Sequence, residues 1–172
     1  MAFEGYVVTK ILHVFLAVAW IGAALYQQIL VQPVLGAVDP AARRQVAGRL
    51  MPQSIRYNNI VGGLTVLTGI GLVSMHPEYG WSDLLTTFWG RLVSFSLVGA
   101  LAMLYLLNVA IRPTLRTLQD KMGELREGEE PSAGLQLLQK RLVFSGRLAL
   151  IIGLIVLAAM VVANTAGYLQ SS

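Results

Sequence analysis

The sequence contains no cysteine and little charge. Without cysteine, the chain can form no disulfide, thiolate metal site or CxxC redox pair, and it has no cysteine nucleophile. Charged residues make up 13% of the 172 residues, against roughly 25% in ordinary globular domains. Hydrophobic residues reach 55%, and the mean hydropathy is +0.63. This balance predicts an integral membrane protein with one domain over residues 1–172.

The sequence also lacks the signatures of common soluble enzymes. There is no Walker A run and no GxGxxG, HExxH or GxSxG pattern. The net charge is +4, but no basic and aromatic patch accompanies it, so no nucleic-acid partner is expected. None of the nine Asp and Glu residues lies inside a predicted span, which disfavours a cation-coupled transporter. No catalytic residue is assigned, and enzymatic activity stays open.

Four apolar windows are long enough to cross a bilayer as helices of about 20 residues. The first window follows Met1 without a signal-peptide pattern, so it is expected to remain as a helix. In the second window, Gly62, Thr65 and Gly69 share one face and are predicted to contact a neighbouring helix. The sequence therefore predicts an all-α integral membrane four-helix bundle. Its spans are residues 11–32, 55–75, 91–111 and 143–164.

The basic residues predict the orientation of the bundle. Lys and Arg occur in the first and third connections, whereas the stretch from Ser74 to Gly90 has none. By the positive-inside rule, the first and third connections face the cytoplasm. Both termini and the middle connection then face outward, which is an N-out/C-out arrangement.

The two basic connections are predicted to hold further helices. Asp39 followed by Pro40 is typical of a helix start and Pro52 of a stop, so residues 40–51 are predicted to form a short surface helix. Two leucine-rich stripes predict a cytoplasmic helical stalk between the third and fourth helices, with an acidic tip at residues 124–130. The stripes are Leu115, Leu118, Met122 and Leu125, and then Leu135, Leu138 and Leu142.

The predicted topology brings the two histidines to a similar depth. His13 lies just inside the outer boundary of the first span, because Lys10 can snorkel to the interface. His76 ends the second span on the same outer side. Two imidazoles without thiolates favour haem b over copper, so both histidines are candidate metal ligands. The alternatives are an interfacial turn residue before Pro77 for His76, and a histidine hydrogen-bonded within the bundle for His13.

Three other residues, Trp20, Arg91 and Asn164, are candidates for cofactor binding. Trp20 and Gln27 follow His13 at steps of seven, and this face is either a wall for a flat ring or ordinary helix packing. Arg91 opens the third span and is a candidate partner for a haem propionate, or a snorkelled interfacial arginine. Asn164 lies near the outer end of the fourth span, where it is a candidate to hydrogen-bond a ligand or a histidine.

The segment from Lys10 to Tyr26, KILHVFLAVAWIGAALY, resembles the opening helix of a group of small bacterial membrane proteins. The group includes the HemJ-type protoporphyrinogen oxidases, the CopD-type copper-resistance proteins and the membrane domain of some urate-oxidising proteins. The Leu-Thr-Gly at residues 67–69 is similar too. The resemblance implies that His13 binds haem in the bacterial inner (cytoplasmic) membrane. Arg91 stands where HemJ-like proteins tend to carry a lysine, and arginine is a poor proton donor, so porphyrinogen oxidation itself is not implied.

Taken together, these features favour a haem-b-binding membrane protein with its haem near the outer face. It would act in electron transfer or in oxidation of a small or porphyrin-like substrate. One alternative is a non-catalytic subunit or assembly factor of a larger membrane complex, because few polar groups lie in the spans. A second alternative is copper or small-solute transport. The lipid bilayer is the expected partner, and a homo-oligomer or a larger complex stays open.

Overall fold

The computed structural model describes residues 2–124 and 132–170, and every regular element in these residues is helical. The all-α prediction is thereby confirmed. Two of the elements, η1 and η3, are π-helical, and η2 is a short 3₁₀ turn. The elements are α1 (Ala2–Tyr26), η1 (Gln27–Val31), α2 (Gln32–Ala37), α3 (Pro40–Met75), η2 (Trp81–Leu84), α4 (Phe88–Tyr105), η3 (Leu106–Ile111), α5 (Arg112–Glu124) and α6 (Ala133–Gln170).

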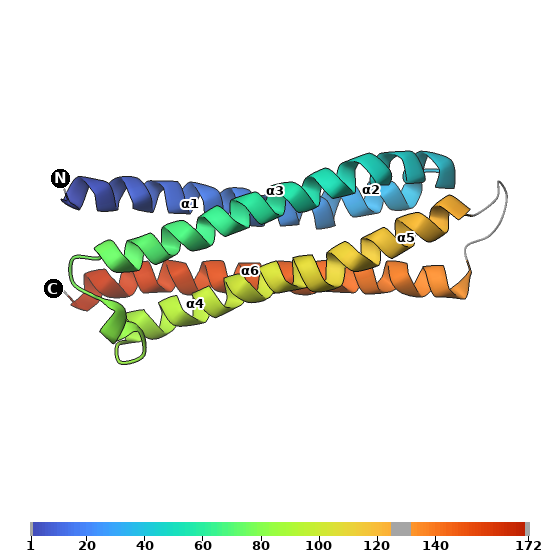
Figure 1. Cartoon of the computed structure of the whole chain (residues 1–172). Helices are drawn as coiled ribbons and strands as arrows, with labels where there is room; N and C mark the ends of the chain where they lie inside the picture. Colours follow the sequence, from blue (N-terminus) through green and yellow to red (C-terminus); the bar gives the residue numbers. More distant parts are fainter. Residues whose placement is uncertain (1, 125–131, 171–172) are drawn as a thin grey trace.

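The elements join into four long rods, and each rod runs antiparallel to the next one along the chain (Figure 1). The first rod is α1, η1 and α2 in series, and the third is α4, η3 and α5, while α3 and α6 are single helices. Each rod contains a segment long and apolar enough to cross a membrane, so four predicted spans are confirmed by length and composition. The segments are Phe3–Ala37, Gly48–Met75, Phe88–Met122 and Ala133–Thr165.

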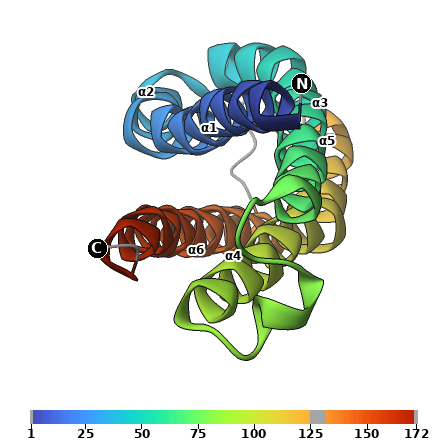
Figure 2. The same cartoon turned by 90° about the vertical axis from the view of Figure 1, so that its left-hand side faces the viewer.

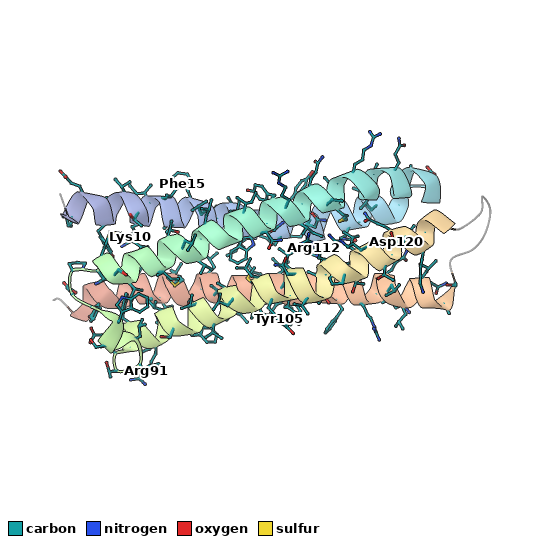
Figure 3. The ribbon with its side chains drawn as sticks, viewed as in Figure 1. Lys10, Phe15, Arg91, Tyr105, Arg112 and Asp120 are labelled. Carbon is teal, nitrogen blue, oxygen red and sulfur yellow. The ribbon has the colours of Figure 1, made fainter. Side chains whose placement is uncertain are left out.

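Large apolar side chains face away from the bundle on all four rods. Phe15 on α1, Leu67 on α3, Val98 on α4 and Phe144 on α6 are each exposed over 64% or more of their surface. Figure 3 shows Phe15 standing outward from α1. Soluble monomers rarely expose apolar surface so extensively. With the four spans, this surface indicates a multi-pass membrane protein in contact with lipid.

The rods associate as two close pairs, α1 with α3 and α4 with α6 (Figure 2). Glycines permit the close approach in both pairs. A Cβ on Gly62 of α3 would lie 2.6 Å from the Trp20 ring of α1, and a Cβ on Gly99 of α4 would overlap Val156 of α6. Gly62 therefore occupies the helix contact that its spacing predicts.

Three apolar clusters follow one another along the bundle. We call them the terminal cluster, nearest the chain ends, the central cluster and the far cluster. They leave two levels between them where polar side chains collect. The terminal cluster is Val73, Trp89 and Ala163; the central cluster is Trp20, Val61, Ala100 and Met103; the far cluster is Val31, Leu35, Met51 and Leu115.

In the first connection, the predicted helix start is confirmed and the predicted helix stop is wrong. Asp39 does cap a helix, since its Oδ1 accepts a 3.0 Å hydrogen bond from the Ala42 amide. Residues 40–51 are not a separate surface helix, because α3 continues through Pro52 to Met75. A proline inside a helix removes one backbone hydrogen bond. Pro52 sits near the start of the apolar segment, where water can satisfy the freed carbonyl.

At the far end, opposite the chain termini, α5 packs beside the start of α6 (Figure 1). Leu115, Leu118 and Leu135 are buried there, so these members of the two leucine stripes face inward, while the cytoplasmic stalk stays a prediction. The turns of α2 and the beginning of α3 reach the same end of the bundle (Figure 1). The predicted acidic tip lies almost wholly outside the described residues.

Candidate functional site

His13 projects from α1 onto α3, where its position is fixed by two oxygens. Its Nδ1 lies 3.0 Å from the carbonyl oxygen of Thr65 and 3.0 Å from the hydroxyl of Thr68. A carbonyl oxygen only accepts, and the Thr68 hydroxyl has its own carbonyl acceptor at Leu64. Nδ1 therefore carries the proton, and the Nε2 lone pair is left available.

A glycine on α3 makes room for the imidazole. A Cβ added to Gly69 would lie only 3.0 Å from Cε1 of His13, so a larger residue there would displace the ring. No hydrogen bond to Nε2 of His13 occurs within residues 2–124 and 132–170. His13 thus combines a fixed ring with an uncommitted nitrogen in an apolar span, which suits a ligand to a metal or an acceptor of a proton.

His76 occupies a different setting just beyond the end of α3. Its Nδ1 accepts hydrogen bonds from the amides of Glu78, at 3.2 Å, and Tyr79, at 3.1 Å. Its ring contacts Tyr6, Tyr79 and Trp89 at centroid distances of 5.5, 5.2 and 4.7 Å. His76 therefore organises the interfacial turn, as one of the two sequence interpretations expected.

The surroundings of His76 disfavour its charged form. Partial burial lowers the pKa of His76, and Lys10 lowers it further, whereas Glu78 raises it. The Lys10 ammonium lies 5.9 Å from the centroid of the Tyr6 ring, which is itself packed on the imidazole. A neutral imidazole is what the two amide donors require, because a protonated Nδ1 could not accept from them.

The structure does not bring the two histidines together. Tyr6, which contacts His76, precedes His13 by seven residues on α1, and this spacing is a rise of about 10 Å. Two ligands of one metal ion would have to lie within a few ångströms of each other. The sequence predicted a similar depth for the two histidines, but they lie at two successive levels of the bundle.

The other predicted site residues are placed apart from His13. Trp20 is 5% exposed and fills the central cluster over Gly62, so the stripe that it forms with His13 and Gln27 is the face of α1 that packs on α3. Arg91 is exposed, and Figure 3 shows it at the edge of the molecule. Asn164 on α6 is exposed too. No contact links Arg91 or Asn164 to His13 within the described part of the chain.

A buried hydroxyl that sequence reasoning missed lies at the level of His13. Ser96 on α4 is 4% exposed, and its Oγ has no hydrogen-bond partner in the described residues. It sits between the α4 residues of the terminal and central clusters, as Thr65 and Gly69 sit between those of α3. The sequence feature that could have identified Ser96 is a serine inside an apolar span at the same depth as His13.

A second polar level, missed except for Gln27, lies between the central and far clusters. We call it the amide layer. Its hydrogen bonds join rods: Ser54 Oγ donates to Gln27 Oε1 at 2.9 Å, and Asn108 Nδ2 donates to Asn59 Oδ1 at 2.7 Å. Ser54 was missed because the second span was predicted to start at residue 55. Asn58, Asn59 and Asn108 lie inside predicted spans, but their spacing along the chain does not show that they meet. The amide layer comprises Gln27, Gln28, Gln32, Ser54, Asn58, Asn59 and Asn108.

A cavity of about 90 Å³ opens within the amide layer. Side chains from all four rods line it, and the polar ones are Gln27, Gln28, Gln32, Ser54 and Asn58. Hydrogen-bonding groups placed around a void in a membrane bundle are a typical setting for a bound polar molecule. The chain thus offers two candidate sites on successive levels, one at His13 and one in the amide layer.

Among the described residues, no group of three His, Asp or Glu side chains is arranged to hold a metal ion. Comparison with family models, with curated proteins and with solved structures gave no match to this chain. The resemblance of the first helix to the HemJ and CopD group therefore stays a prediction, and function is argued from the two sites themselves.

Proposed function

We propose that the chain is a b-type haem protein of the membrane in which Nε2 of His13 is the protein ligand of the iron. The hydrogen bond between Nδ1 of His13 and the Thr65 carbonyl carries this proposal. Histidines that ligate metals usually donate their other ring N–H to a carbonyl or carboxylate, which fixes the tautomer and makes the ligating nitrogen more basic. Thr65 would serve His13 in this way, with Thr68 as a second acceptor.

The residues around His13 fit such a group in two further respects. The buried hydroxyl of Ser96 lacks a partner and lies at the level of His13, so it could donate to a polar atom of a bound ligand. Apolar clusters lie on both sides of this level, and an apolar shell restricts access of water to a haem. When bound, haem supplies one-electron chemistry, while the chain holds it and orients its ligand.

The separation of His13 from His76 favours one histidine ligand rather than two. With one histidine ligand, a bound haem would be open to a small molecule, so the proposed role is oxidation of a small or porphyrin-like substrate rather than electron transfer alone. His76 then belongs to the fold of the interfacial turn. Arg91 and Asn164 are not assigned to the ligand, because both are exposed.

The proposed orientation rests on the basic residues. Arg49, Arg56, Arg112 and Arg116 lie at the far half of the bundle, whereas the turn between α3 and α4 has no Lys or Arg. By the positive-inside rule the far end would face the cytoplasm of a bacterial inner membrane, with both termini outward. The extension formed by α5 and the start of α6 would then be the cytoplasmic stalk, and His13 would lie near the outer face.

An absorption spectrum tests the proposal. Wild-type protein produced with ample haem should show a Soret band that shifts on reduction. His13→Ala should lose most of this band, whereas the matched variant His76→Ala should keep it. Thr68→Val should retain haem because the Thr65 carbonyl remains as an acceptor. Wild-type protein that is colourless after production with haem, and that cannot be reconstituted, would refute the proposal.

A further inference from the structure

The cavity in the amide layer is closed along the bundle by apolar side chains at both ends. Trp20 and Met103 of the central cluster line one end, and Met51 and Leu115 of the far cluster line the other. Because these side chains close both ends, the space is a pocket rather than a continuous channel along the bundle. It also lies a level away from His13, which is not among its lining residues.

The lining of the cavity is mostly apolar, with a few polar side chains and no ionisable one. Its polar members are the amides of Gln27, Gln28, Gln32 and Asn58 and the hydroxyl of Ser54. A charged ligand at membrane depth would meet no opposite charge there, and burying an unpaired ion is costly. An uncharged ligand needs only hydrogen bonds, which amides supply as both donors and acceptors.

Some of these amides are already used within the protein, and others are not. Gln27 accepts from Ser54 and donates to the Met51 sulfur at 3.0 Å, so both ends of its amide are engaged. The side chains of Gln28 and Gln32 make no hydrogen bond to any described residue, although both line the cavity. These two amides are therefore the groups available to a ligand.

Close packing directs Gln28 into the bundle. A Cβ added to Gly146 of α6 would overlap the Gln28 amide, so the glycine provides the space that this side chain occupies. The glutamine crosses from the first rod toward the fourth at the wall of the cavity. An uncharged amide held inside a membrane bundle without a protein partner is expected to meet a bound polar molecule.

Both π-helices found in residues 2–124 and 132–170 contribute to this cavity. In η1 the backbone N–H of Gln32 donates to the backbone carbonyl of Gln27. In η3 the backbone N–H of Arg112 donates to the backbone carbonyl of Leu107. Gln27, Gln28 and Leu107 all line the void. Single π-helical turns are rare and frequently mark functional positions. Two of them, on the first and third rods, at one cavity point to a built site.

We propose that the cavity binds one small uncharged molecule that both donates and accepts hydrogen bonds, of the class of short amides, ureas and polyols. Its volume of about 90 Å³ is smaller than the roughly 150 Å³ of an engineered protein cavity that binds benzene. This limits the ligand to a few heavy atoms and excludes a macrocycle. The site is therefore separate from the proposed haem function.

A single introduced cysteine tests the proposal, because the chain has no cysteine of its own. Ser54→Cys places a thiol in the cavity wall and is close to isosteric. Its reaction with methyl methanethiosulfonate would be followed in nanodiscs with and without urea, acetamide or glycerol. We expect one probe to slow labelling about threefold once its concentration is about twice its dissociation constant. Ser54→Cys combined with Gln28→Leu should lose this protection.

Controls make each outcome decisive. Leu30→Cys, on the exposed side of η1, should be indifferent to the probes, and sucrose, which is too large for the cavity, should not protect Ser54→Cys. Labelling of Ser54→Cys that no probe slows would mean that only water enters, and it would overturn the proposal. Equal slowing of Leu30→Cys would overturn it too, as would no labelling at all. If Ser54→Cys does not fold, Ala149→Cys tests the same wall from α6. None of these readouts depends on haem.

Discussion

Ser54 on α3 and Gln27 on η1 are joined by a 2.9 Å hydrogen bond from the serine hydroxyl to the glutamine carbonyl. The bond ties the first rod to the second inside the apolar segments of both. It also commits Gln27, whose amide nitrogen turns to the Met51 sulfur. The pair therefore shapes the wall of the cavity, and it leaves Gln28 as the free neighbour in the same π-helical turn.

Replacing Ser54 by alanine should destabilise the bundle. The Gln27 carbonyl would lose its donor, and we expect a loss of roughly 0.6–2 kcal/mol, because interhelical hydrogen bonds in membranes are modest. Thermal unfolding in detergent micelles measures this. The matched control is Ser74→Ala, whose hydroxyl is exposed and bonds only to Ile70 within its own helix. Equal melting temperatures for the two variants would contradict the role of the Ser54–Gln27 pair.

Adjacent glycines on α3 should respond to alanine in opposite directions. A Cβ on Gly62 would lie 2.6 Å from the Trp20 ring, so Gly62→Ala should separate α1 from α3 and cost about 1–3 kcal/mol. No atom lies within 4 Å of a Cβ on Gly63. Gly63→Ala should instead stabilise the helix by about 0.5–1 kcal/mol. Thermal melts of both variants in one detergent compare them, and a stabilised Gly62→Ala would show that the helices can slide apart freely.

Local patterns in the sequence predicted the features that depend on local chemistry. Asp39 is a helix cap because a carboxylate next to a proline suits that position in almost any context. The stripe of His13, Trp20 and Gln27 forms one contact face because a step of seven keeps residues on one side of a helix. The four spans followed from hydropathy for the same reason.

Features that depend on neighbouring rods could not be predicted in this way. A proline usually ends a helix, yet α3 continues past Pro52, since the freed carbonyl can be satisfied near a polar boundary. The π-helical turns insert a residue where two rods must adjust to one another, and no propensity marks them. The separation of His13 and His76 depends on which residues they touch, which depth alone does not specify.

Acidification should disturb the turn after α3 through His76. Burial and Lys10 lower the pKa of this histidine in the folded protein, against the opposing effect of Glu78, so the unfolded chain takes up the proton more readily. Stability from this group is therefore present above the unfolded pKa of 6.5 and falls as the pH drops below it. Protonation also ends acceptance from the Glu78 and Tyr79 amides.

Tryptophan fluorescence can follow this change, because the Trp89 ring centroid lies 4.7 Å from that of His76. We expect quenching on titration from about pH 8 to pH 5, the range in which histidine charges. His76→Phe should abolish the quenching while keeping an aromatic ring between Tyr6 and Tyr79. Trp89→Phe should abolish it as well, whereas a transition that persists in His76→Phe would assign it to another group.

The corner between η2 and α4 should be the least tolerant of a methyl group. A Cβ on Gly90 would overlap the Asp83 carbonyl oxygen and the backbone of Leu84, and backbone atoms cannot move aside as a flexible side chain can. Gly90→Ala should therefore cost about 3 kcal/mol, more than Gly62→Ala. Gly71→Ala is the matched control, since its Cβ would meet ordinary contacts at 3.7 Å and beyond. Thermal melts of the two variants measure this. If Gly90→Ala and Gly71→Ala have equal melting temperatures, the corner is looser than its geometry indicates. The close contact at Gly90 would then not be what holds the neighbouring Trp89 in the terminal cluster.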